Sequence, residues 1–191
     1  MDELLEQRAL LLELIEDVTS ISGDTAALIR SLPEDLSPER EAVVRAACSL
    51  VGKVNYFWGG KSLVIGWDAR WGELRQVTAA GSPTTGTYCP YGLDCSGFVD
   101  WVIYNATGGS YIIGHGGGAT MQHHYCADIR WEDAQPGDLV FYPDNSHVGI
   151  VGGRDANGEL LIIHCASGHN NVVITGRVGF TSAGRPQYYS D

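Results

Sequence analysis

Hydrophobic and polar residues recur with two different periods along the chain, and the change of period divides it into a helical first half and a strand-rich second half. Apolar residues recur at helical spacing from Leu4 to Val18, opposite a face rich in glutamate, which predicts an amphipathic helix. Because this helix has a periodicity of its own, we expect residues 1–37 to form an acidic helical appendage or linker. Residues 38–191 are expected to form the folded domain.

Two further helices are predicted in the first half. One runs from about Pro38 to Val51, since Ser37 is a favourable N-cap and proline is tolerated at the first helical position. Residues 61–90 contain many turn-forming residues and are expected to form an irregular excursion. The other helix begins at Cys95, and its apolar positions share one face: Phe98, Val99, Val102 and Ile103.

The second half contains four short runs that are rich in β-formers and separated by turn residues: 137–142, 147–153, 159–166 and 171–176. A helix-rich half followed by a meander of strands is typical of an α+β fold. We therefore expect the helical first half to pack on a mainly antiparallel sheet.

The second and third of these runs can be paired by counting from the turn between them. If residues 155–158 form a four-residue loop, Arg154 faces Glu159 across the hairpin. Counting onward places His164 diagonal to His147 on the same face of the sheet. A bulge or a loop of odd length would break this relation.

The net charge is acidic and unevenly spread. The 191 residues carry a formal net charge of −11, and most of the acidic excess lies in residues 1–41. Nucleic-acid binding needs clustered basic residues, so a nucleic-acid partner is excluded. No run approaches the roughly 20 apolar residues of a membrane span, and the acidic start is unlike a secretory signal peptide. Either the protein works where it is made, or the chain is the tail of a longer exported protein.

The five cysteines are an odd number, so at least one thiol stays free: Cys48, Cys89, Cys95, Cys126 and Cys165. No CxxC pair indicates a zinc site. The cluster of His123, His124 and Cys126 is interpreted as ordinary loop residues, because adjacent histidines point in different directions. No metal and no cofactor are therefore predicted.

The stretch YGLDCSGFVDW, residues 91–101, places Cys95 at the start of a helix, directly after an aspartate that can cap it. A helix N-terminus and a neighbouring imidazole both favour the thiolate form. With His147 as base and His164 orienting its ring, these residues would form a triad for acyl transfer. Each of them alone is more often inert, so only their combination supports catalysis.

The motifs of this chain resemble those of the NlpC family of papain-like cysteine peptidases, which cut bacterial cell-wall peptides. YFWGG precedes the cysteine, DCSG surrounds it, and PGDLVFY, SHVGIV and IIHCASG follow in the order of the family. The resemblance covers roughly residues 40–190 and implies a papain-like fold with the catalytic cysteine at a helix N-terminus. The stretch between Gly60 and Asp94 is longer than the family usually shows, and it could cover the cleft.

The resemblance implies three catalytic residues: the nucleophile Cys95, the general base His147 and the third polar residue His164. Asp94 and Ser96 match positions that hold the N-terminal amine of the substrate in family members acting on free stem peptides. Tyr56 matches a tyrosine that lines the cleft beside the nucleophile.

Together these expectations predict a bacterial peptidoglycan hydrolase, a cysteine endopeptidase that cleaves the amide between D-isoglutamate and the next diamino acid of stem peptides. Its partners would be stem peptides, at an extracellular or wall-associated location, with any anchoring supplied by further domains of a longer parent protein. The alternatives are an N-acetylmuramoyl-L-alanine amidase or an amide acyltransferase on the same fold, and a non-catalytic wall-binding module. The intact set of Cys95, His147 and His164 argues against a decayed site.

Overall fold

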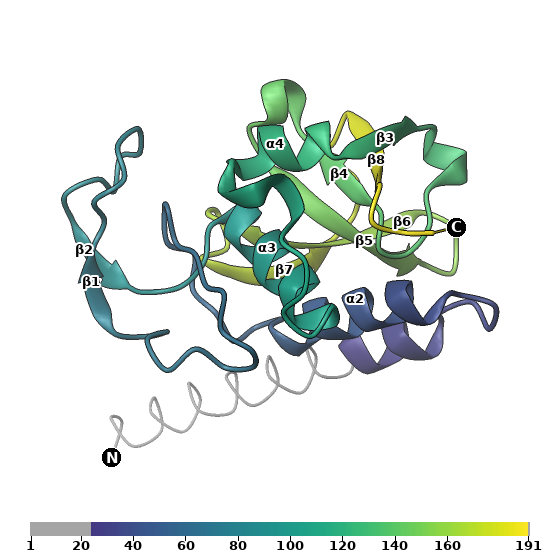
Figure 1. Cartoon of the computed structure of the whole chain (residues 1–191), viewed down its shortest axis with the longest axis horizontal. Helices are drawn as coiled ribbons and strands as arrows, with labels where there is room; N and C mark the ends of the chain where they lie inside the picture. Colours follow the sequence, from purple (N-terminus) through teal and green to yellow (C-terminus); the bar gives the residue numbers. More distant parts are fainter. Residues whose placement is uncertain (1–23, 191) are drawn as a thin grey trace, which may run out of the picture.

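The computed structural model describes residues 24–190, and Figure 1 shows helices lying beside a twisted sheet. Its six strands are ordered β3-β8-β4-β5-β6-β7, and every neighbouring pair is antiparallel. The predicted α+β class is confirmed. The strands are β3 (Cys126–Ile129), β4 (Leu139–Phe141), β5 (Val148–Arg154), β6 (Leu160–Ala166), β7 (Asn171–Thr175) and β8 (Ser182–Pro186).

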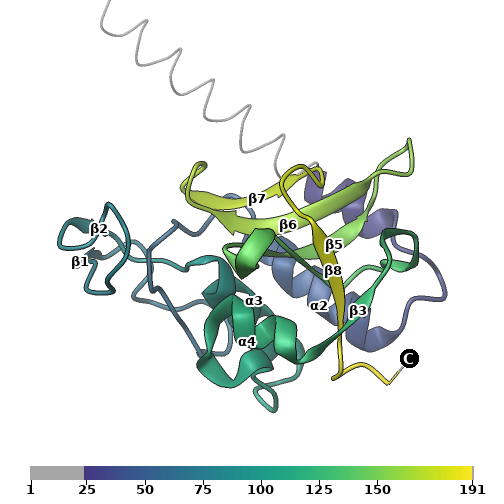
Figure 2. The same ribbon diagram turned by 90° about the horizontal axis from the view of Figure 1, so that it is seen from above.

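Helices α2 (Pro38–Ser49) and α3 (Cys95–Ala106) pack against each other and against β5, and Figure 2 shows them together from above. The start of α2 is as predicted, because the Ser37 hydroxyl accepts a hydrogen bond from the Arg40 backbone N–H at 3.4 Å. Burial of apolar surface holds the helices on the sheet. The fully buried residues of this layer include Val43, Val44, Phe98, Val99, Val102, Ile103, Ile150 and Ile163.

Helix α3 is buried on more sides than its apolar stripe predicts. Every residue of the range Cys95–Ile103 is buried. The reason lies in residues 61–67, which run across the helix: Trp101 Nε1 donates to the Gly66 carbonyl, and the Gly66 N–H donates to the Asn105 side chain. This segment covers the helix face that the sequence pattern leaves to solvent.

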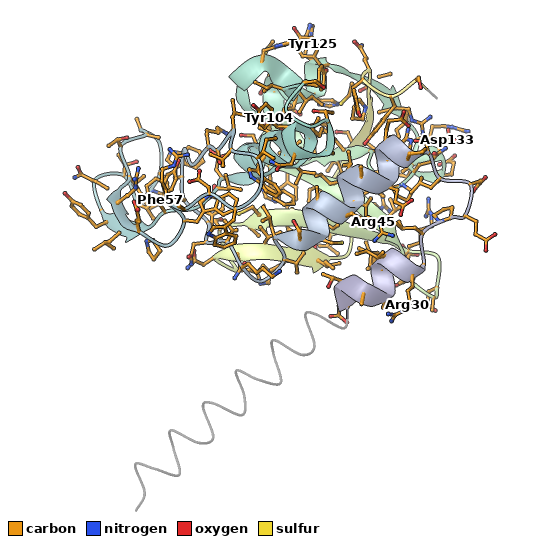
Figure 3. The ribbon with its side chains drawn as sticks, turned by 60° about the horizontal axis from the view of Figure 1, so that its bottom comes forward. Arg30, Arg45, Phe57, Tyr104, Tyr125 and Asp133 are labelled. Carbon is orange, nitrogen blue, oxygen red and sulfur yellow. The ribbon has the colours of Figure 1, made fainter. Side chains whose placement is uncertain are left out.

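Residues 61–90 are mostly irregular, as predicted, but they include a small two-stranded sheet. β1 (Leu74–Gln76) pairs antiparallel with β2 (Tyr88–Pro90). Figures 1 and 2 both show this hairpin standing apart from the main sheet. Figure 3 labels Phe57 on the same side of the molecule, and its ring lies 4.9 Å from that of Tyr91, edge to face. Aromatic packing therefore joins the hairpin to the domain.

The sequence analysis does not anticipate β3, β8 or α4 (Gly118–His124). β8 has the sequence SAGRP, in which Gly and Pro disfavour strands, yet it lies between β3 and β4. Backbone hydrogen bonds to β3 on one edge and to β4 on the other outweigh the low strand propensity of these residues. Three short 3-10 helices complete the described chain: η1 (Ile113–Gly116), η2 (Trp131–Asp133) and η3 (Pro143–Asn145).

The β5–β6 hairpin differs from the prediction at its tip but not at its far end. Arg154 pairs with Leu160 and not with Glu159, so the expected four-residue loop is wrong. A β-bulge in β5 then shifts the register again, and Ile150 pairs with Ile163. The longer loop and the bulge each shift the alternation by one residue, so their effects cancel. Beyond the bulge, the strand faces are those expected from the sequence.

Part of the predicted appendage contributes to the core. Residues 24–30 are helical, and Leu28 is only 3% exposed. A Cβ atom built on Gly152 of β5 would lie 2.8 Å from the Leu28 side chain, so this helix approaches the strand closely. The helix expected near the start of the chain lies outside the described residues, and the domain boundary at residue 37 stays a prediction. No helix between residues 24 and 190 is long and apolar enough to cross a membrane.

Candidate active site

Cys95 lies in the first turn of α3, where the helix meets the start of β5. Asp94 caps the helix, because its Oδ1 atom accepts a hydrogen bond from the Gly97 N–H at 2.6 Å. The cap leaves the Cys95 backbone N–H among the first helical donors, which have no intrahelical acceptor. Backbone hydrogen bonds from Val148 and Ser96 reach the thiol. The sulfur therefore abuts the strand residue that directly follows His147.

His147 and His164 are joined by a hydrogen bond of 2.7 Å between His147 Nε2 and His164 Nδ1. The two rings thus lie on the same face of the sheet. His164 is only 5% exposed, and a Cβ atom on Gly149 would come within 3.2 Å of its Cβ. The Phe180 ring lies 5.4 Å from the ring of His164 and 5.7 Å from that of His147. Close packing therefore leaves both imidazoles little freedom.

Thr175 of β7, which the sequence analysis does not single out, fixes the tautomers of both histidines. His164 Nε2 lies 2.8 Å from Thr175 Oγ1, and that hydroxyl donates to the Gly176 carbonyl at 3.0 Å. A hydroxyl has one proton, so with that proton directed at Gly176 we assign Thr175 as the acceptor from His164 Nε2–H. His164 Nδ1 is then an acceptor, and His147 Nε2 is the donor.

The unprotonated nitrogen of His147 is therefore Nδ1. Among residues 24–190, no hydrogen bond engages this atom. Nδ1 is therefore open to accept a proton, and Val148, the residue after His147, interacts through its backbone with the Cys95 thiol. The hydrogen-bond chain from β7 through β6 thus determines which nitrogen of His147 can accept a proton.

The site favours the neutral forms of the thiol and the imidazoles. Burial raises the pKa of the Cys95 thiol, and the Asp94 carboxylate raises this pKa further. Burial lowers the pKa of His147 to about 4 and that of His164 to about 3. These shifts run against the thiolate that the helix start favours, because the thiol and the His147 imidazole are both buried.

Lys61 completes the site in a way that the sequence does not signal. Its Nζ atom lies 2.7 Å from Asp94 Oδ1 and 2.6 Å from Ser96 Oγ. Its positive charge lowers the pKa of the Cys95 thiol and so opposes Asp94. Asp94 and Ser96, which the resemblance assigns to a substrate amine, already hold an ammonium group of the chain itself. Lys61 and Asp94 are 33 positions apart in the sequence, so no local pattern identifies this contact.

Tyr56 lines a cleft beside the two histidines. The cleft has a volume of about 710 Å³, and its walls include Trp58, Tyr142 and Val178. The Tyr56 backbone N–H donates to Asn170 Oδ1 at 3.2 Å, which ties the two cleft edges together. Burial, followed by the negative charges of the Cys95 thiolate and of Asp94, raises the pKa of the Tyr56 hydroxyl. Tyr56 therefore lies close to the thiol.

Metal-binding geometry is not found in the described part of the chain, where no three His, Cys, Asp or Glu side chains are grouped to hold an ion. His123 instead stacks on Phe141 at 3.9 Å and hydrogen-bonds through Nδ1 to Asn145 at 2.7 Å. All five cysteines are free thiols.

Comparison with known proteins yields a family and several relatives. The model of the NlpC/P60 family matches residues 52–175. A probable endopeptidase of Mycobacterium tuberculosis is 32% identical over 140 residues, which cover 71% of this chain and 26% of the relative. The chain thus spans about a quarter of the length of the curated relatives that it matches.

Solved structures share the fold. The peptidoglycan hydrolase RipB of M. tuberculosis aligns with a TM-score of 0.54 and 22% identity, over 91% of this chain and 86% of that chain. RipD of the same organism, described as a non-catalytic NlpC/p60 domain protein adapted to peptidoglycan binding, aligns with a TM-score of 0.55 and 19% identity, over 78% and 98%. These likenesses confirm the predicted papain-like fold. With the family model matching well over half of its length, the chain belongs to the NlpC/P60 family.

Proposed function

We propose that this chain is a cysteine endopeptidase that cleaves the D-isoglutamyl to diamino acid amide of peptidoglycan stem peptides. The observation that carries the proposal is the hydrogen-bonded row of His147, His164 and Thr175, which leaves His147 Nδ1 as a base beside a thiol at a helix N-terminus. Relatives described as a probable endopeptidase and a peptidoglycan hydrolase support the reaction and substrate class. A bacterial cell-wall location follows from that substrate.

In the proposed reaction, the sulfur of Cys95 attacks the amide carbonyl while His147 Nδ1 takes the thiol proton. The Cys95 backbone N–H stabilises the oxyanion that forms. The imidazolium then donates its proton to the leaving amine, and the C–N bond breaks to leave a thioester. Water, deprotonated by the same Nδ1, hydrolyses the thioester and restores the thiol.

The experiment compares the wild type with Cys95→Ala on defined muropeptides and weighs the products. An endopeptidase releases one fragment ending in D-isoglutamate and one beginning with the diamino acid, and the variant releases neither. A product beginning with free L-alanine would instead indicate an amidase, and a new amide would indicate an acyltransferase. Binding without cleavage by either protein would indicate a wall-binding module.

A further inference from the structure

A second cavity continues the cleft beyond Tyr56 and Trp58. It has a volume of about 610 Å³, and Tyr56, Trp58 and Ser167 line both spaces. The two cavities therefore form one groove that begins beside His147. The far wall of the second cavity comes from the 61–90 excursion, through Gly81, Ser82, Pro83, Thr84, Tyr88, Cys89 and Pro90.

This far wall is held in place by contacts at its base. Trp58 Nε1 donates a hydrogen bond to the Ala80 carbonyl at 2.9 Å. Gly59 has a φ of +76°, and a Cβ atom there would lie 2.7 Å from the Ala79 Cβ, so only glycine permits this approach. Within the loop, the Thr85 hydroxyl donates to the Ala79 carbonyl at 2.7 Å. The cavity is thus largely preformed, as ligand sites usually are.

The lining of the second cavity is aromatic and uncharged. No Asp, Glu, Lys or Arg side chain is among the described residues that line it. Tyr56, Trp58 and Tyr88 contribute aromatic rings, and Tyr88 is 64% exposed. The polar lining groups are hydroxyls and one side-chain amide, from Ser82, Thr84, Ser167 and Asn170.

Such a lining fits a neutral ring with many hydroxyl groups. The apolar C–H face of a pyranose packs on an aromatic ring, while its hydroxyl and acetamido groups hydrogen-bond to neutral polar side chains. A charged peptide terminus would find no counter-ion in this cavity. At the neighbouring Asp94 and Ser96, a free amino terminus would meet the ammonium group of Lys61, which repels it.

We propose that the second cavity is a saccharide subsite, and that the enzyme prefers stem peptides still attached to an N-acetylated amino sugar over free stem peptides. The preference between substrates rests on the proposed function. Binding of the sugar does not, because it requires no turnover.

The kinetic test compares kcat/KM for one stem peptide in two forms, free and linked to its N-acetylglucosaminyl-N-acetylmuramoyl disaccharide. We expect the wild type to favour the linked form by roughly fivefold or more, the range of one good stacking contact. Tyr88→Ala should bring this ratio close to one. Leu74→Ala is the matched control, since Leu74 is 69% exposed on the paired strand of the same hairpin but does not line the cavity. A wild-type ratio of one, or an unchanged ratio in Tyr88→Ala, would overturn the proposal.

A binding test separates this proposal from the proposed function. The disaccharide without peptide, with its lactyl carboxyl group converted to the neutral amide, is titrated into the wild type, Tyr88→Ala and Leu74→Ala, and heat is measured. Cellobiose serves as a sugar lacking acetamido groups. Saturable binding of the disaccharide that Tyr88→Ala weakens and Leu74→Ala retains supports the subsite even if no muropeptide is cleaved. Absence of binding at millimolar disaccharide, or equal binding by all three proteins, would overturn the subsite even if peptides are cleaved.

Discussion

The two walls of the proposed active-site groove are built in opposite ways. His147 and His164 stand at the β5–β6 end of the main sheet, over fully buried aliphatic residues and a hydrogen-bond chain to Thr175. The 61–90 wall exposes large apolar side chains and is held mainly by hydrogen bonds to backbone carbonyls and by aromatic contacts. We therefore expect substitutions in the first wall to alter turnover, and substitutions in the second wall to alter which substrate is bound.

The largest loss of activity is expected on substitution of His147, the proposed base. His147→Ala removes the group that accepts the thiol proton, so kcat should fall by about 10²- to 10⁴-fold with little change in KM. Steady-state kinetics on a defined muropeptide measure both constants. His124→Ala is the control, because His124 is exposed and lies outside the groove. A kcat for His147→Ala within a few-fold of wild type would remove His147 from the mechanism.

A smaller effect is expected at His164, which orients the ring of His147 and moves no proton itself. His164→Ala should lower kcat more than it raises KM. The loss in kcat should be roughly 10- to 100-fold, smaller than the loss on removing the nucleophile or the base. Circular dichroism checks that the fold survives the loss of this buried ring. Equal losses for His164→Ala and His147→Ala would contradict a purely orienting role.

A still smaller effect is expected at Thr175. Thr175→Val removes the acceptor of His164 Nε2–H while keeping the shape of the side chain, so kcat should fall about two- to tenfold, as for one neutral hydrogen bond. Thr175→Ser should restore the rate. Nitrogen NMR shifts of the two imidazoles should show protonated Nε2 in the wild type and mixed tautomers in Thr175→Val. Protonated Nδ1 on His147 in the wild type would refute the assigned chain.

The smallest expected effect is a loss of folding stability that is absent at neutral pH and develops only in acid. Burial lowers the pKa of His147 to about 4 and that of His164 to about 3, from an ordinary 6.5. Between pH 6.5 and the lowered pKa of each histidine, the unfolded chain binds more protons than the folded chain. Stability therefore falls as the pH drops from 6.5 toward these lowered pKa values. The pKa of buried Asp100 is raised to about 6, so its protonation in the folded state offsets part of the loss.

The 61–90 wall should lose stability at a lower pH than β5 and β6. Hydrogen bonds from Arg70 hold the pKa of the Asp68 carboxyl well below its ordinary 3.8, so its stabilisation is lost only as pH falls below that value. Protection factors, which are exchange rates corrected for the pH dependence of free amides, should therefore fall in β5 and β6 between pH 6.5 and 4, and in residues 61–90 only in stronger acid. Protection that is lost first in residues 61–90 at pH 5 would reverse this order.

The parts of the fold that sequence predicts are those set by neighbouring residues. Ser37 and Asp94 cap helices through contacts three residues away, and both helix starts are confirmed. The hairpin count places His164 correctly, although it misses both the longer loop and the bulge, because their shifts cancel. β8 is missed, since SAGRP becomes a strand only through its long-range partners.

The site residues divide in the same way, into those with a local sequence signal and those that depend on distant segments. Cys95 and His147 stand out because each follows a local cap or turn signal, and His164 stands out because the hairpin count places it on the same face as His147. Lys61 and Thr175 have no such signal, since their contacts depend on how distant segments meet. The burial that raises the pKa of Cys95 and lowers that of His147 has no local signal either, although the helix start before Cys95 is visible in the sequence.

The most direct test of the central claim is to trap the acyl-enzyme. The wild type is quenched in acid during turnover of a linked muropeptide, and its peptides are mapped by mass. We predict an adduct with the mass of the disaccharide-linked L-alanyl-D-isoglutamyl group on the peptide containing Cys95, absent from Cys95→Ala. Buried Cys126, with a pKa raised to about 12, should remain unmodified. Full turnover by Cys95→Ala, or an adduct on another cysteine, would contradict the account.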